Sequence, residues 1–258
     1  MNRIRRRPAE ALKSLEVASR VESASVESTS HRQAECTLFA PHHYEPGYAY
    51  PLLVWLHGPG DDERQLRRIM PHVSLRNYVG VGPRGCCPPE FGEPGFGWQQ
   101  SEDSICRAER RVFEAIDTAR QRYHVADDRV FLAGFQCGGT MALRIGLRHP
   151  ESFAGVLSIG GCFPRHLAPL THLQAIQRLP LFIAQGRESR LYPVDVTCDE
   201  LRLFHSAALR VMVRQYPCGD ELTTQMLHDM DLWMMERING VMPDSPPCHS
   251  LVLPCEEN

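Results

Sequence analysis

Short apolar runs alternate with helical patterns along most of the chain, and this alternation limits the fold more than any other feature. Runs such as Leu52–Leu56 and Val130–Ala133 are apolar at every position, as expected for strands buried on both faces of a parallel sheet. Between the runs, apolar residues recur at helical spacing, for example at Ile105, Ala108 and Val112. The pattern predicts an α/β fold with a doubly wound, mostly parallel sheet flanked by helices. The predicted strands are Thr37–Ala40, Leu52–Leu56, Tyr78–Val81, Val130–Ala133, Gly155–Ile159, Leu181–Ala184 and Val211–Gln215.

A single domain is predicted over residues 34–240, with a polar tail at each end. The length of 258 residues suits one α/β domain with a substantial core. Residues 1–33 are rich in Arg, Glu and Ser and predict a mobile tail, while the prolines of residues 241–258 predict an extended or disordered one. Residues 83–100 and 161–180 carry many Gly or Pro residues and interrupt the alternation, so the sequence leaves their conformation open.

The composition excludes several classes of partner and location. A formal net charge of -3 provides no general attraction to nucleic acid. No apolar run approaches the roughly 20 residues of a membrane span, and the basic N-terminus lacks the apolar stretch of a secretory signal, so a cytoplasmic location is the default. The ten cysteines have no C-x-x-C spacing and are expected to be free thiols. No metal site is expected, because His42–His43 and Cys248–His249 lack further spaced ligands.

The segment Gly134–Gly139, which reads Gly-Phe-Gln-Cys-Gly-Gly, directly follows the apolar run Val130–Ala133. It has the pattern of a nucleophile elbow, a sharp strand-to-helix turn with glycines two residues before and two residues after its apex. The apex here is Gln136, whose side-chain amide cannot attack a carbonyl carbon. The segment therefore predicts the scaffold of a hydrolase without its usual nucleophile.

Three further segments join this one, namely Leu56–Asp61, Gly186–Pro193 and Tyr216–Leu222. Together the four segments resemble the phospholipase/carboxylesterase family of α/β-hydrolases, over roughly residues 35–240. The resemblance implies an α/β-hydrolase fold and hydrolysis of carboxylic esters or thioesters without a cofactor. It also implies a catalytic triad in the chain order Ser, Asp, His.

Carried onto this sequence, the resemblance places the three triad positions at Gln136, Ser189 and Asp220. Ser189 lies four residues before the loop-closing Pro193, and Asp220 follows a glycine just before the last predicted helix. No position holds the residue that the family uses. We expect these three side chains to converge in a hydrogen-bonded cluster, in which the Gln136 amide and the Ser189 hydroxyl donate to Asp220.

The oxyanion hole that the resemblance implies is also altered. One donor is the backbone amide of Cys137, the residue after the apex. The second donor lies in the loop that begins at Gly58 and maps to Pro59, which has no N–H. A shift of the loop by one residue would offer the amide of Gly60 instead. In the same loop, His57 is expected to have a structural role.

Two functions follow from these residues. The first is a non-catalytic, pseudo-hydrolase protein that binds a small acyl-ester-like ligand or a protein partner. The alternative is an active ester or thioester hydrolase with Cys137 as a displaced nucleophile, since a helix N-terminus lowers the pKa of a thiol. Trp98, after the Gly-rich segment, either lines the mouth of a pocket or packs on the long helix.

Overall fold

The computed structural model describes residues 36–85 and 95–240. The tails predicted at residues 1–33 and 241–258 lie outside the described residues, so both remain predictions. Within the described ranges, no helix is both long enough and apolar enough to cross a bilayer. The cysteines in these ranges are free thiols.

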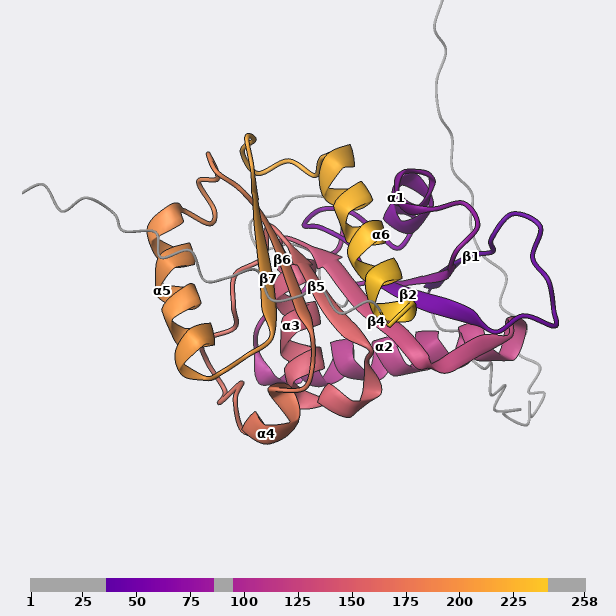
Figure 1. Ribbon diagram of the computed structural model, residues 1–258, viewed down its shortest axis with the longest axis horizontal. Coiled ribbons are helices and arrows are strands. Elements are labelled where there is room, and N and C mark those ends of the chain that lie inside the picture. The colour runs from indigo at the N-terminus through magenta and orange to yellow at the C-terminus, as the bar shows by residue number, and fades with distance from the viewer. Residues whose placement is uncertain (1–35, 86–94, 241–258) are drawn as a thin grey trace, which may run out of the picture. The chain divides into compact units, whose positions relative to one another are not determined.

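A seven-stranded sheet runs through the described part (Figure 1). Its strand order is β1-β3-β2-β4-β5-β6-β7, and every neighbouring pair is parallel except β1 with β3. Each predicted strand overlaps an observed one, which confirms the doubly wound, mostly parallel sheet. The strands are β1 (Cys36–Phe39), β2 (Tyr50–Leu56), β3 (Val79–Pro83), β4 (Val125–Phe135), β5 (Gly155–Ile159), β6 (Leu181–Gly186) and β7 (Val211–Tyr216).

Strand β4 is longer than the apolar run that predicted it. The run covers Val130–Ala133, whereas the strand begins at Val125 and ends at Phe135. The segment Ala126–Arg129 is half-buried or exposed and carries three charged side chains. A continuous apolar run in the sequence indicates only the buried part of a strand, so it does not reveal a segment that extends out of the core. The pairing of β4 with β2 is also irregular in this region.

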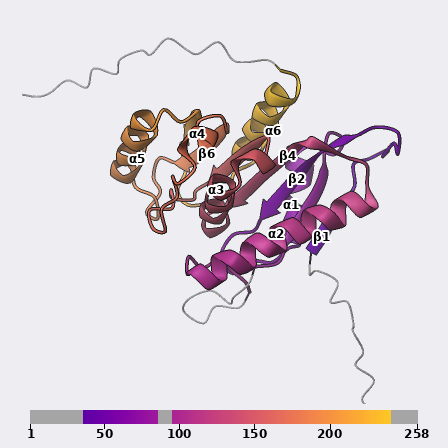
Figure 2. The same ribbon diagram turned by 90° about the horizontal axis from the view of Figure 1, so that it is seen from below.

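Helices cover both faces of the sheet (Figure 2). One buried cluster joins the sheet to α2, α3 and α5, and a second joins its other face to α1 and α6. The carboxyl ends of the parallel strands share one edge, where the loops after β2, β4, β6 and β7 meet. The helices are α1 (Gln65–Val73), α2 (Glu102–Arg122), α3 (Cys137–Arg148), α4 (Leu173–Ile176), α5 (Val194–Ser206) and α6 (Thr224–Ile238), with a 3₁₀ turn, η1 (Pro150–Ser152).

Candidate functional site

The turn between β4 and α3 is sharp and strained at its apex. Gln136 has φ 48° and ψ −115°, a left-handed conformation that costs a non-glycine residue about 1–3 kcal/mol. The flanking glycines make the turn possible. A Cβ on Gly134 would lie 2.4 Å from the carbonyl of Gly138, and a Cβ on Gly138 would lie 2.3 Å from the carbonyl oxygen of Leu56. Close backbone packing therefore holds the elbow, whatever side chain stands at position 136.

The three residues that the resemblance places at the triad positions, Gln136, Ser189 and Asp220, lie together at this edge of the sheet. The Gln136 side-chain amide donates to the backbone carbonyl of Asp220 at 2.8 Å. The Ser189 hydroxyl donates to the Asp220 carboxylate at 2.5 Å. The acceptor for Gln136 is thus the main chain of Asp220, whereas the carboxylate is held by the loop after β6.

The Asp220 carboxylate is the acceptor of a small group of donors from that loop. Besides the Ser189 hydroxyl, the backbone amides of Arg190 and Leu191 donate to it at 3.2 and 3.3 Å. The Ser189 hydroxyl in turn accepts from the amide of Tyr192 at 2.8 Å. The hydrogen bond from Ser189 lowers the pKa of Asp220, and the two backbone amides act in the same direction. Asp220 therefore remains ionised and ties the loop after β7 to the loop after β6.

A cavity of about 10 Å³ lies at this cluster and is lined by Gln136, Ser189, Tyr192 and Asp220, among others. We call it the elbow cavity. A space of this size holds about one water molecule. The buried hydroxyl of Tyr192 has no partner among the described residues. The elbow cavity therefore has room for a single water molecule, and an acyl chain does not fit into it without movement of its walls.

The loop after β2 offers few donors to this site. Pro59 has no N–H, and the amide of Gly60 already donates to the carbonyl of Phe96 at 3.0 Å. The amide of Phe96 returns a bond of 3.0 Å to the carbonyl of Asp61. A one-residue shift of the alignment from Pro59 to Gly60 therefore adds no free amide. The Cys137 amide stands at the first residue of α3, where an N–H has no acceptor within the helix.

His57 is a structural residue of this loop. It is fully buried, its Nδ1 lies 2.8 Å from the carbonyl of Gly58, and its Nε2 accepts from the amide of Gly85 at 2.9 Å. This network assigns the proton to Nδ1. Burial lowers the pKa of His57, so the ring is neutral. Trp98 is also buried, and its indole N–H donates to the carbonyl of His57 at 3.0 Å. Trp98 also belongs to the buried cluster that includes the long helix α2.

Cys137 is half-buried at the start of α3. Burial raises the pKa of its thiol, although contacts with the backbone of Trp98 and Gly138 act in the opposite direction. The position at a helix N-terminus predicts a lowered pKa, but in the structure desolvation outweighs that effect. At neutral pH the Cys137 side chain is therefore a thiol and a poor nucleophile.

Glu200 is a residue that sequence analysis missed. It is only 2% exposed, and burial raises its pKa to about 7. The signal was present in the helical period, because Thr197, Glu200 and Phe204 share the buried stripe of α5. An acidic residue on a stripe that faces the core is a candidate functional group. In the described part of the chain, no three His, Cys, Asp or Glu side chains gather to hold a metal ion.

Known proteins share this architecture. NocK from Nocardia uniformis subsp. tsuyamanensis is 28% identical over 153 residues, which cover 56% of this chain and only 42% of NocK. Acyl-protein thioesterase 1 homolog 2 from Dictyostelium discoideum is 22% identical over 178 residues, covering 63% of this chain and 78% of that protein. The crystal structure of the Bacillus cereus carboxylesterase has a TM-score of 0.64 at 18% identity, covering 81% of this chain and 96% of that one. This structural likeness shows the α/β-hydrolase fold.

The segments that suggested a family lie within one continuous match. The family described as Phospholipase/Carboxylesterase matches residues 47–238, which include the elbow, the loop after β2 and the loops after β6 and β7. With most of the chain matched and the fold shared, this carboxylesterase- and thioesterase-like protein belongs to the phospholipase/carboxylesterase family of α/β-hydrolases.

Proposed function

We propose that the protein is a non-catalytic member of its family, a pseudo-hydrolase that binds a small acyl-ester-like ligand or a protein partner. The observation that carries the proposal is the cluster of Gln136, Ser189 and Asp220, hydrogen-bonded to one another around a cavity of about 10 Å³. The resemblance to the family places the nucleophile, the acid and the base of its triad at these three positions.

The hydrogen-bond donor and the carboxylate of this cluster stand in exchanged places compared with a triad. In a triad, the carboxylate accepts a hydrogen bond from an N–H group of the histidine ring. The other ring nitrogen of the histidine removes the proton from the serine hydroxyl. Here the carboxylate stands on the loop after β7, at Asp220, and the donor stands on the loop after β6, at Ser189. Asp220 is engaged by three donors, and Gln136 has no proton whose removal would create a nucleophile at neutral pH.

Stabilisation of an oxyanion is also weakened. With Pro59 lacking an N–H and the Gly60 amide donating to Phe96, the amide of Cys137 has no second donor from the loop after β2. Loss of one such donor costs about 10²–10³ in turnover even where a triad is intact. The absence of nucleophile and base would add to that cost.

For the alternative, hydrolysis by a displaced Cys137, no titratable side chain of the described residues is hydrogen-bonded to the thiol. Burial keeps the Cys137 side chain in its thiol form. The neighbouring His57 uses both ring nitrogens in backbone contacts, with Gly58 and Gly85. A thiol without a base is a weak nucleophile at neutral pH.

The test is hydrolysis of p-nitrophenyl acetate, p-nitrophenyl butyrate and a short-chain acyl thioester by the purified full chain. Cys137→Ser and Gln136→Ala are the matched variants. We expect the native protein and both variants to show equal rates at the uncatalysed background. Turnover that Cys137→Ser abolishes and Gln136→Ala retains would overturn the proposal and identify a cysteine hydrolase.

A further inference from the structure

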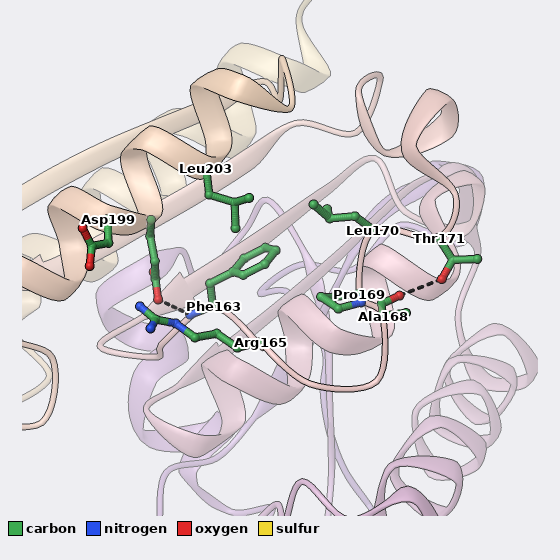
Figure 3. Close-up of a pocket in the computed structure, with 9 residues that line it drawn as sticks. Phe163, Arg165, Ala168, Pro169, Leu170, Thr171, Asp199 and Leu203 are labelled. Carbon is green, nitrogen blue, oxygen red and sulfur yellow. Dashed lines mark hydrogen bonds between the residues drawn. The ribbon is translucent and has the colours of Figure 1, made fainter.

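A second, much larger cavity lies between α5 and the segment that follows β5 (Figure 3). Its volume is about 540 Å³, within the range of small-molecule sites. We call it the α5 pocket, and it shares no lining residue with the elbow cavity. Figure 3 shows Leu203 above the Phe163 ring and Leu170 to its upper right. The lining residues are Phe163, Arg165, Ala168, Pro169, Leu170, Thr171, Asp199, Glu200 and Leu203.

Glu200 is the buried polar group of this apolar pocket. Its Oε1 accepts a hydrogen bond of 3.0 Å from the backbone amide of Phe163. Its Oε2 is buried and has no hydrogen-bond partner among the described residues. Buried polar atoms in folded proteins are almost always paired, so an unpaired carboxylate oxygen of a pocket-lining residue is a place where a ligand can supply the partner. For the ionised carboxylate, that partner is a hydrogen-bond donor.

The other polar side chains of the α5 pocket are already engaged or lie at its edge. The Thr171 hydroxyl donates to the carbonyl of Ala168 at 2.7 Å. Asp199 is exposed and forms an ion pair of 2.8 Å with Arg202. Arg165 is exposed and acts on Glu200 electrostatically, but no ion-pair contact joins the two within the described residues. The unmet hydrogen-bonding capacity therefore belongs to Glu200.

The charges around Glu200 favour a cation over an anion. Asp199 is already paired with Arg202, so Glu200 is the carboxyl group of the lining without an ion-pair partner among the described residues, and the guanidinium of Arg165 is exposed. The neighbouring thiol of Cys162 has a raised pKa, because of burial and the charge of Glu200, and stays neutral. A cationic donor would also keep Glu200 ionised, since an opposite charge within contact distance favours the charged form of an acid.

We propose that the α5 pocket binds an apolar amine, a molecule with a hydrocarbon or aryl body and one protonated nitrogen that donates to Oε2 of Glu200. The apolar body would contact Phe163, Leu170 and Leu203, and burial of its surface would supply most of the affinity. The ammonium group would supply the orientation, because its charge-assisted hydrogen bond to a buried carboxylate is directional.

Titration calorimetry of the full chain with octylamine tests this assignment, with octanol and octanoate as chain-matched controls. At pH 8 we expect octylamine to bind more tightly than octanol, and octanoate to bind least. Between pH 8 and pH 5.5 the octylamine affinity should fall about tenfold or more, because Glu200, with a pKa of about 7, takes up a proton. Equal or tighter binding of octanoate, or no binding of octylamine, would overturn the proposal.

Two carboxylates on neighbouring positions of α5 provide a matched pair of variants. Glu200→Gln keeps the size of the side chain and should weaken octylamine binding about tenfold or more at pH 8. Asp199→Asn removes the same charge one residue away at an exposed site and should change the affinity less than about threefold. Equal effects of the two variants would show a general charge effect and would contradict a contact with Glu200.

A third variant tests the location independently of charge. Leu203→Trp adds bulk to an exposed lining residue and should abolish binding of octylamine and octanol alike, while thermal unfolding checks that the fold persists. Retained binding would place the ligand elsewhere and overturn the proposal. Because the α5 pocket and the elbow cavity share no lining residue, these results do not depend on whether the elbow is catalytically inert.

Discussion

The elbow cavity and the α5 pocket differ in the space that lies beside their polar groups. At the elbow, Gln136, Ser189 and Asp220 are hydrogen-bonded to one another, and only about 10 Å³ of space remains beside them and the unpaired hydroxyl of Tyr192. In the α5 pocket, one oxygen of Glu200 has no partner among the described residues, and about 540 Å³ stands open beside it. The difference teaches that the positions at which the resemblance implies a triad, and the space that would accept a ligand, lie at separate places in this fold.

The largest effect is expected from rebuilding a triad at the elbow. The variant Gln136→Ser, Ser189→Asp, Asp220→His should hydrolyse p-nitrophenyl acetate slowly, since only one oxyanion donor is present. Addition of Pro59→Gly should raise the rate about 10²–10³-fold by supplying the second amide. Equal rates with and without Pro59→Gly would contradict our view of the oxyanion loop.

The control for this experiment is the same set of four changes with Gln136→Ala in place of Gln136→Ser. It keeps the altered loops and removes only the nucleophile. Any hydrolysis that this control retains is not due to the rebuilt triad. Such a result would contradict our description of the elbow, because position 136 would then not be the reactive position.

A smaller effect, on stability, is expected where backbone packing holds the elbow. Gly138→Ala would bring a Cβ to 2.3 Å from the carbonyl oxygen of Leu56, and we expect a loss of about 3 kcal/mol in unfolding free energy. Gly47→Ala is the matched control, since nothing lies within 4 Å of its Cβ position, and should change stability by less than about 0.5 kcal/mol. Urea unfolding of both variants measures the difference, and similar values would argue against a rigid elbow.

Burial of Glu200 in the α5 pocket should make the unfolding free energy depend on pH. The folded-state pKa of Glu200, about 7, lies above its value in an unfolded chain, so the native state binds more protons between those values. Stability of the native protein should therefore fall as pH rises from about 4.5 to 7. Glu200→Gln should lack this component, which we put at about 1–2 kcal/mol after allowance for solvent screening. A pH-independent difference between the two proteins would contradict the burial of an ionisable carboxyl group.

The smallest effect is expected at Asp220, whose pKa is lowered chiefly by the hydrogen bond from Ser189. Its contribution is present above the unfolded pKa of an aspartate, about 3.9, and is lost as pH falls through the lower folded value. Asp220→Asn should therefore lower the melting temperature slightly at pH 7, and the difference from the native protein should shrink as the pH falls below about 3.9. A difference that grows in acid would show that the carboxylate is not the stabilising form.

The sequence predicted the sheet well because its strands are buried on both faces. Continuous runs such as Leu52–Leu56 need no knowledge of distant contacts, whereas the polar half of β4, Ala126–Arg129, gave no such signal. At the elbow, glycine spacing was sufficient to indicate the turn. The acceptor of the Gln136 amide was only partly predicted, because a side-chain pattern does not indicate that a main-chain carbonyl, that of Asp220, will be in reach.

Features that depend on loop conformation could not be predicted from the sequence. The bond from the Gly60 amide to Phe96 joins two loops that are far apart in the chain, and no periodicity reports on it. The α5 pocket depends on the segment after β5, which the sequence marked only as irregular. Glu200 could have been identified from the helical period of α5, since one buried stripe contains it with Thr197 and Phe204.

The strained backbone at Gln136 has a consequence for protein engineering. The flanking glycines Gly134 and Gly138 are closely packed against main-chain atoms, so we expect a replacement at position 136 to keep the same backbone conformation. Position 136 is thus a suitable place at the edge of the sheet for a cysteine, a fluorescent label or an unnatural amino acid whose backbone orientation is known. A strained backbone at a strand-to-helix turn therefore marks a position that can be modified with a defined geometry.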